Sequence, residues 1–119
     1  MIVEDVAYNR DLLVQILEDT YALVTASTGI EALAQAAAAH PDLILLDLAL
    51  PEVDGWEVAR RLKADPVLRH VPIVAVTAFA MPEDRKSALE AGCGDYLAKP
   101  IDEDELLACV QRFLEPPES

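Results

Sequence analysis

The sequence predicts one α/β domain in which a five-stranded parallel sheet carries five helices on its two faces. Short apolar runs alternate five times with longer amphipathic segments along the 119 residues, a pattern typical of repeated strand–helix units. The run Leu43–Leu46 is apolar on every side and closely follows Pro41, as expected for a strand buried on both faces. Right-handed crossovers then favour a doubly wound sheet with strand order 2-1-3-4-5.

Local signals predict where each element begins and ends. Apolar residues at positions 12, 13, 16 and 17 recur with helical spacing and predict the first helix. Thr28 and Asp54 each stand three residues before an acid, which is typical of helix N-caps. Pro82 suits the start of a helix and Gly92 suits the end of one. The expected strands are 1–3, 21–26, 43–46, 72–76 and 96–98, and the expected helices run from about 7 to 18, 28 to 39, 54 to 65, 82 to 92 and 102 to 114.

Composition excludes several classes of protein. The formal net charge of −13, from 22 acidic and 9 basic residues, argues against binding to nucleic acid or to an anionic membrane. Two cysteines, Cys93 and Cys109, fit neither a disulfide framework nor a four-ligand zinc site, and we expect both to be reduced. Acids within the first five residues argue against a signal peptide, and no apolar run approaches the roughly 18 residues of a membrane span. We therefore expect a cytoplasmic domain with no nucleic-acid or membrane partner.

Charged or polar residues stand at the carboxyl ends of four expected strands. They are Asp5 with the adjacent Glu4, Asp47, Thr77 and Lys99. In the expected strand order the first and third strands are neighbours at the switch point of the sheet, where such folds bind ligands. Each close pair of acids there would repel by about 4 kcal/mol at an effective dielectric constant near 20, and a divalent cation would relieve that repulsion.

The chemistry of these side chains predicts a phosphoryl site. Oxygen ligands from a few carboxylates favour Mg²⁺, which also binds phosphate oxygens. Lys99 offers a positive charge to an anion, and Thr77 offers a hydroxyl donor. Carboxylate, Mg²⁺, ammonium and hydroxyl together describe a site for a phosphoryl group attached to an aspartate.

The full set of motifs resembles the receiver domain of two-component response regulators, of the single-domain chemotaxis type. The resemblance covers residues 1–114, and residues 115–119 form an acidic tail that contains proline. The matching stretches are Val3-Glu4-Asp5, Leu43 to Asp47, Pro51 with Asp54-Gly55, Val76-Thr77-Ala78, and Tyr96 with Lys99-Pro100. The resemblance implies a flavodoxin-like fold and a signalling domain that catalyses only its own phosphorylation and dephosphorylation.

The resemblance also implies roles for individual residues. Asp47 would accept the phosphoryl group from a phosphohistidine on a histidine kinase or a histidine phosphotransfer protein. Mg²⁺ would be held by Asp5, Asp47 and the backbone carbonyl of Ala49, with Glu4 acting through water. The phosphoryl contacts and the conformational switch would involve Thr77, Ala78, Tyr96 and Lys99, and the Lys99–Pro100 peptide bond would be cis. A downstream effector would bind the face formed by the fourth helix, the fifth strand and the fifth helix.

Other functions fit the residues less well. A phosphatase of the haloacid dehalogenase type would need a second aspartate where Ala49 stands, and Glu4 and Asp5 would repel the phosphate of a flavin. A receiver used only for binding would lack a site residue, and none is missing. The chain could be a receiver segment excised from a larger hybrid kinase or regulator. The sequence leaves open the cognate kinase, the output partner, the oligomeric state and the phosphoryl lifetime, which Ala49 and Phe79 would modulate.

Overall fold

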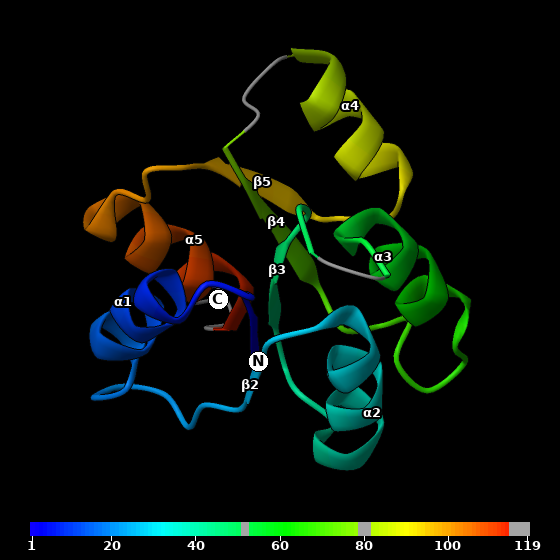
Figure 1. Cartoon of the computed structure of the whole chain (residues 1–119), viewed down its shortest axis with the longest axis horizontal. Coiled ribbons are helices and arrows are strands. Elements are labelled where there is room, and N and C mark those ends of the chain that lie inside the picture. The colour runs from blue at the N-terminus through cyan, green and yellow to red at the C-terminus, as the bar shows by residue number, and fades with distance from the viewer. Residues whose placement is uncertain (51–52, 79–81, 115–119) are drawn as a thin grey trace, which may run out of the picture.

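The computed structural model describes residues 1–50, 53–78 and 82–114. It contains a five-stranded parallel sheet in the order β2-β1-β3-β4-β5, which confirms the predicted topology (Figure 1). The elements in chain order are β1 (Ile2–Val3), α1 (Ala7–Leu17), β2 (Thr25–Ala26), α2 (Gly29–Ala39), β3 (Ile44–Asp47), α3 (Gly55–Ala64), β4 (Ile73–Thr77), α4 (Pro82–Glu90), β5 (Asp95–Ala98) and α5 (Glu103–Leu114). The tail 115–119, Pro51 and Phe79 lie outside the described residues.

Helices cover both faces of the sheet, and alternate strand residues divide the core between the two faces. Ile44 and Leu46 of β3 pack in the cluster that includes residues of α2, α3 and α4. Leu45, between them, packs with residues of α1 and α5 on the opposite face (Figure 1). Because successive side chains of a strand point to opposite faces, a strand covered on both sides must be apolar at every position, as this one is.

Side-chain caps start three of the helices where the sequence predicts them. The hydroxyl oxygen of Thr28 accepts a hydrogen bond from the amide of Glu31 at 3.0 Å. Carboxylate oxygens of Asp54 and Asp102 accept equivalent bonds from the amides three residues later, each at 2.9 Å. These bonds satisfy amides that have no partner inside the helix, so they fix where α2, α3 and α5 begin.

The second strand is shorter than the sequence predicts. The prediction covers residues 21–26, but β2 contains only Thr25 and Ala26. These residues pair with Ile2 and Val3, the only residues of β1. A strand forms only where a neighbouring strand supplies hydrogen-bond partners. The prediction for residues 21–24 was wrong because it did not take into account that β1, the partner strand, contains only two residues.

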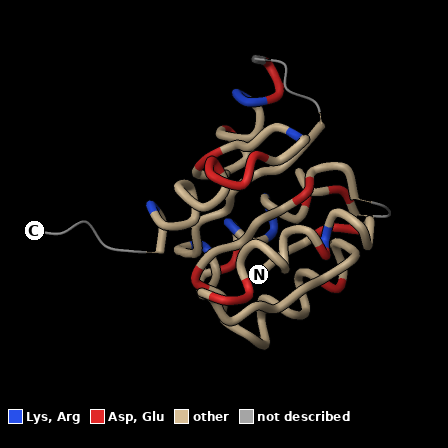
Figure 2. Tube along the Cα trace, turned by 90° about the vertical axis from the view of Figure 1, so that its left-hand side faces the viewer, with Lys and Arg blue, Asp and Glu red and all other residues tan. Residues whose placement is uncertain are grey.

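Acidic residues are distributed over many parts of the chain, as Figure 2 shows. Most of the negative charge therefore belongs to the general surface. The two cysteines are free and buried, as expected. Among the described residues, no helix has both the length and the apolar character needed to cross a membrane.

Candidate functional site

The predicted site residues meet at the carboxyl edge of the sheet. Asp47 is the last residue of β3 and Thr77 the last of β4, while Glu4 and Lys99 follow β1 and β5 within a residue. Ligand oxygens of Glu4, Asp5 and Asp47 all lie within 4.8 Å of one another. The switch point between β1 and β3 therefore brings Asp47 next to the adjacent acids Glu4 and Asp5, although more than 40 residues separate them in the sequence.

Lys99 lies among these acids as an internal counter-ion. Its ammonium donates to Glu4 Oε1 at 2.7 Å and to Asp47 Oδ2 at 3.1 Å. Both carboxyl side chains are buried, so the shared ammonium offsets part of the cost of removing two negative charges from water. The backbone amide of Lys99 donates to the Thr77 carbonyl at 2.8 Å, which ties the lysine to the end of β4. The next peptide bond, Lys99–Pro100, is cis.

The environment separates the pKa values of the two buried acids. Burial raises the pKa of Glu4 from 4.5 to about 7, and the adjacent Asp47 adds to the rise while Lys99 opposes it. Burial also acts to raise the pKa of Asp47, but the bonds with Glu4 and with the Ala49 amide, together with Lys99, lower it below its ordinary value. Asp47 therefore stays ionised, whereas Glu4 gains or loses its proton near neutral pH.

Both oxygens of Asp47 have hydrogen-bond donors. The amide of Ala49 donates to Oδ1 at 2.9 Å, and Lys99 contacts the other oxygen, Oδ2. Burial acts to lower the pKa of Lys99, but its contacts with Glu4 and Asp47 raise it above its ordinary value. The lysine is thus a permanent positive charge beside Asp47.

The donor set fits a hard divalent cation. Glu4 Oε2 is buried and has no hydrogen-bond partner among the described residues. Asp5, in contrast, is exposed and offers its carboxylate from the solvent side of the same cluster. A group of carboxylate oxygens with one buried oxygen unsatisfied suits Mg²⁺, which combines a few protein oxygens with water.

Glycine at position 55 lets the first residue of α3 lie in close contact with the backbone of Asp47. A Cβ atom there would lie 2.4 Å from the Asp47 carbonyl oxygen and 2.5 Å from Leu48 Cα. The Gly55 amide also donates to the Leu48 carbonyl at 3.1 Å. The match to Asp54-Gly55 in the sequence thus has a physical basis, because any larger residue would push the helix away from the site.

The predicted switch residues lie on or directly after the neighbouring strands β4 and β5 and differ in exposure. Thr77 is buried, Ala78 is exposed and Tyr96 is half-buried. A small cavity of about 110 Å³ lies between Thr77, Ala49, Trp56, Leu48 and Asp84. Thr77 and Trp56 both line this cavity, so a movement of Thr77 would change the surroundings of the single tryptophan.

Sequence reasoning missed two residues near the site. Arg10 of α1 donates from Nη1 to the Glu4 carbonyl at 3.0 Å and so holds the turn that carries the acid pair. Trp56 lines the cavity beside Thr77, although its position on α3 gave no sign of this. An arginine or a tryptophan on an amphipathic helix is ordinarily a surface or packing residue, and nothing in the sequence distinguishes these two.

The fold and the site together define a class of signalling domain. A buried aspartate beside an acid pair, a threonine and a lysine, at the switch point of a 2-1-3-4-5 sheet, is suited to accepting a phosphoryl group. Residues 1–111 match the sequence model of the response regulator receiver domain, and the chain belongs to this family. It is the receiver domain of a two-component response regulator.

Known relatives agree with this assignment over nearly the whole chain. The polar-differentiation response regulator DivK of Brucella ovis is 44% identical over 115 residues, which cover 96% of this chain and 94% of that relative. The receiver domain of the sensor histidine kinase PA1611 of Pseudomonas aeruginosa, solved with a magnesium ion in its active-site cleft, is 37% identical with a TM-score of 0.89, over 97% of this chain and 95% of that one. The Vibrio cholerae chemotaxis protein CheY4 is 31% identical with a TM-score of 0.89, and the match covers 95% of each chain.

Proposed function

We propose that Asp47 is the phosphoacceptor of this receiver, which spans residues 1–114, and that its donor is a phosphohistidine of a histidine kinase or histidine phosphotransfer protein. The observation that carries the proposal is the state of the Asp47 carboxylate. It is buried, its pKa is lowered, and the Ala49 amide and Lys99 bond to its two oxygens. A preorganised, ionised carboxylate of this kind is the nucleophile that the transfer requires.

In the transfer, a carboxylate oxygen of Asp47 attacks phosphorus while the bond to the histidine nitrogen breaks and its electron pair returns to the imidazole. Lys99, already 3.1 Å from Oδ2, offsets the negative charge on the phosphoryl oxygens. Asp5, Asp47 and the Ala49 carbonyl would hold Mg²⁺, with Glu4 acting through water, and the bound cation would supply further positive charge to these oxygens. The domain catalyses its own phosphorylation and dephosphorylation and has no other substrate.

The same proposal includes the conformational response. Thr77 and Ala78 would approach the phosphoryl group, and Tyr96 on the neighbouring strand would follow the threonine. The signal is a shift between two populated conformations. A downstream effector would read it on the face formed by α4, β5 and α5. A cytoplasmic location agrees with the two free thiols, Cys93 and Cys109.

Acetyl phosphate with Mg²⁺ provides the test. The intact mass of the wild-type domain should increase by one phosphoryl group, and Asp47→Asn should show no increase. Asp42→Asn is the matched control, because Asp42 is an exposed acid just before the opposite end of β3 and should leave the mass gain unchanged. A full gain in Asp47→Asn would refute the assignment.

A further inference from the structure

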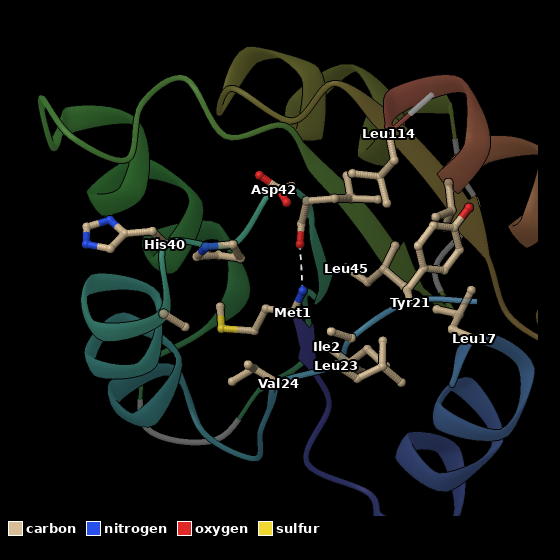
Figure 3. Close-up of a pocket in the computed structure, with 15 residues that line it drawn as sticks. Met1, Ile2, Leu17, Tyr21, Leu23, Val24, His40, Asp42, Leu45 and Leu114 are labelled. Carbon is tan, nitrogen blue, oxygen red and sulfur yellow. Dashed lines mark hydrogen bonds between the residues drawn. The ribbon is translucent and has the colours of Figure 1, made fainter. Parts of the chain in front are cut away.

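Cavities in the domain differ in their distance from Asp47. One of about 320 Å³ lies at the amino end of the sheet, where the Met1 nitrogen donates to the Leu43 carbonyl, and is remote from the acid cluster (Figure 3). Close to the cluster are the cavity of about 110 Å³ beside Thr77 and an open groove of about 750 Å³ between α3 and α4. Trp56 and Asp84 line both the Thr77 cavity and the α3–α4 groove. These two side chains therefore lie between the site and the groove.

Asp84 brings a negative charge to this boundary from the first turn of α4. It is half-buried, whereas the flanking Glu83 and Arg85 are exposed. The structure records no ion pair between Asp84 and any residue that it describes. Burial raises the pKa of Tyr96, and the charge of Asp84 adds to the rise. The carboxylate of Asp84 thus lies near both expected switch residues, Thr77 across the cavity and Tyr96 on β5.

The Thr77 cavity also leads to the acceptor carboxylate. Ala49 lines the cavity, and its amide donates to Asp47 Oδ1 at 2.9 Å. Lys99 contacts the other oxygen, Oδ2, and no basic residue is among those that line the cavity in the part of the chain that the structure describes. A phosphoryl group carries about two negative charges near neutral pH. Screening by salt acts over about 10 Å at 0.1 M, so a phosphoryl group on Asp47 and the charge of Asp84 repel each other.

The packing of α4 allows it to respond to this repulsion. Ala88 is the only buried side chain among those of α4 that the structure describes. The helix packs against β5 (Figure 1), while the α3–α4 groove separates it from α3. An element that buries little apolar surface costs little free energy to displace.

We propose that Asp84 couples phosphorylation of Asp47 to a displacement of α4. With α4 in the position described above, the charge of Asp84 disfavours a phosphoryl group at Asp47. Movement of Asp84 away from Thr77 relieves the repulsion, so phosphorylation favours the displaced helix. This coupling is reciprocal, and a displaced α4 raises the affinity of the site for the phosphoryl group. Asp84 is thus a positioning residue for α4, and its role rests on the proposed assignment of Asp47 as the acceptor.

Titration with beryllofluoride, an analogue of the phosphoryl group, tests this coupling at saturating Mg²⁺. Trp56 is the single tryptophan, and its emission should report binding because it lines both the cavity and the groove beside α4. Asp84→Asn removes the charge and keeps the size of the side chain. The variant should bind beryllofluoride at least about fivefold more tightly than the wild type. Its emission change should be less than about half that of the wild type, because α4 no longer moves.

Two variants control for net charge and for the shape of the side chain. Glu83→Gln removes the same charge from the neighbouring exposed position, which lines neither the cavity nor the groove. It should bind beryllofluoride within about twofold of the wild type. Asp84→Glu retains the charge and should restore both the affinity and the emission change. Raising NaCl from about 0.05 to about 0.5 M should reduce the difference in affinity between the wild type and Asp84→Asn.

The outcomes distinguish this inference from the assignment of the acceptor. Equal affinities for the wild type and Asp84→Asn, or tighter binding with an undiminished emission change, would overturn the role of Asp84 and leave the acceptor assignment in place. Equally tight binding by Glu83→Gln would also overturn that role, because the effect would then come from net charge alone. An emission change in Asp47→Asn equal to that of the wild type would refute the acceptor assignment, and the role of Asp84 with it.

Discussion

Replacing Glu4 with glutamine removes the charge that the buried site accommodates least well. Folding raises the pKa of Glu4 from 4.5 to about 7. A rise of roughly 2.5 pKa units corresponds to about 3 kcal/mol, at 1.36 kcal/mol per unit. Because the folded state binds this proton more tightly than the unfolded state, its contribution to stability is fully present below pH 4.5 and is lost as the pH rises through about 7.

Urea denaturation in EDTA at a series of pH values measures this term. Between pH 4.5 and 7.5 the wild type should lose about 3 kcal/mol of unfolding free energy relative to Glu4→Gln, whose amide cannot ionise. Glu90→Gln is the control, because Glu90 is exposed on α4, and its curve should run parallel to that of the wild type. Excess Mg²⁺ should reduce the difference between wild type and Glu4→Gln, since a bound cation stabilises the ionised acid.

The other charged groups of the site act in separate pH ranges. The pKa of Asp47 is lowered by its hydrogen bonds and by Lys99 despite its burial, so its contribution is present above pH 3.8 and is lost as the pH falls below that value. The pKa of Lys99 is raised by its two acidic partners despite burial, so its contribution is lost only as the pH rises beyond 10.5. Both ranges lie outside pH 4.5 to 7.5, so only Glu4 among these three groups should change the stability within it. Parallel stability curves for wild type and Glu4→Gln in that range would contradict the claim that burial raises the pKa of Glu4.

Three further substitutions probe the geometry of the site. Gly55→Ala should destabilise the fold by about 2–4 kcal/mol and slow phosphorylation, because its Cβ would collide with the backbone at Asp47. Gly94→Ala is the control, because its Cβ would lie closest to a side chain, the ring of Phe113 at 3.2 Å, and it should cost less than about 1 kcal/mol. Equal losses of unfolding free energy in the two variants would contradict this interpretation. Asp5→Ala should abolish the Mg²⁺-dependent rise in melting temperature, and an undiminished rise would place the cation elsewhere. Lys99→Ala should bind Mg²⁺ at least as tightly as the wild type but accept phosphate about 100-fold more slowly, and wild-type kinetics in a stopped assay would remove Lys99 from the reaction.

The sequence predicts the site because a parallel sheet collects the carboxyl ends of its strands. Asp47, Thr77 and Lys99 each follow a recognisable apolar run, so the strand order alone brings them together. The extent of β2 could not be predicted in the same way, because it depends on the length of β1. The direct bond between Lys99 and Glu4 depends on side-chain conformations, which residue order does not specify.

The acceptor assignment can be tested at a single residue. Borohydride reduces an acyl phosphate to an alcohol, so a phosphorylated aspartate becomes homoserine, which tandem mass spectrometry locates in the sequence. After treatment with acetyl phosphate and Mg²⁺, we expect homoserine at position 47. Asp5, which lies in the same acid cluster, should remain aspartate. Homoserine at position 5, or none at position 47 in a domain whose mass has increased by a phosphoryl group, would contradict the assignment.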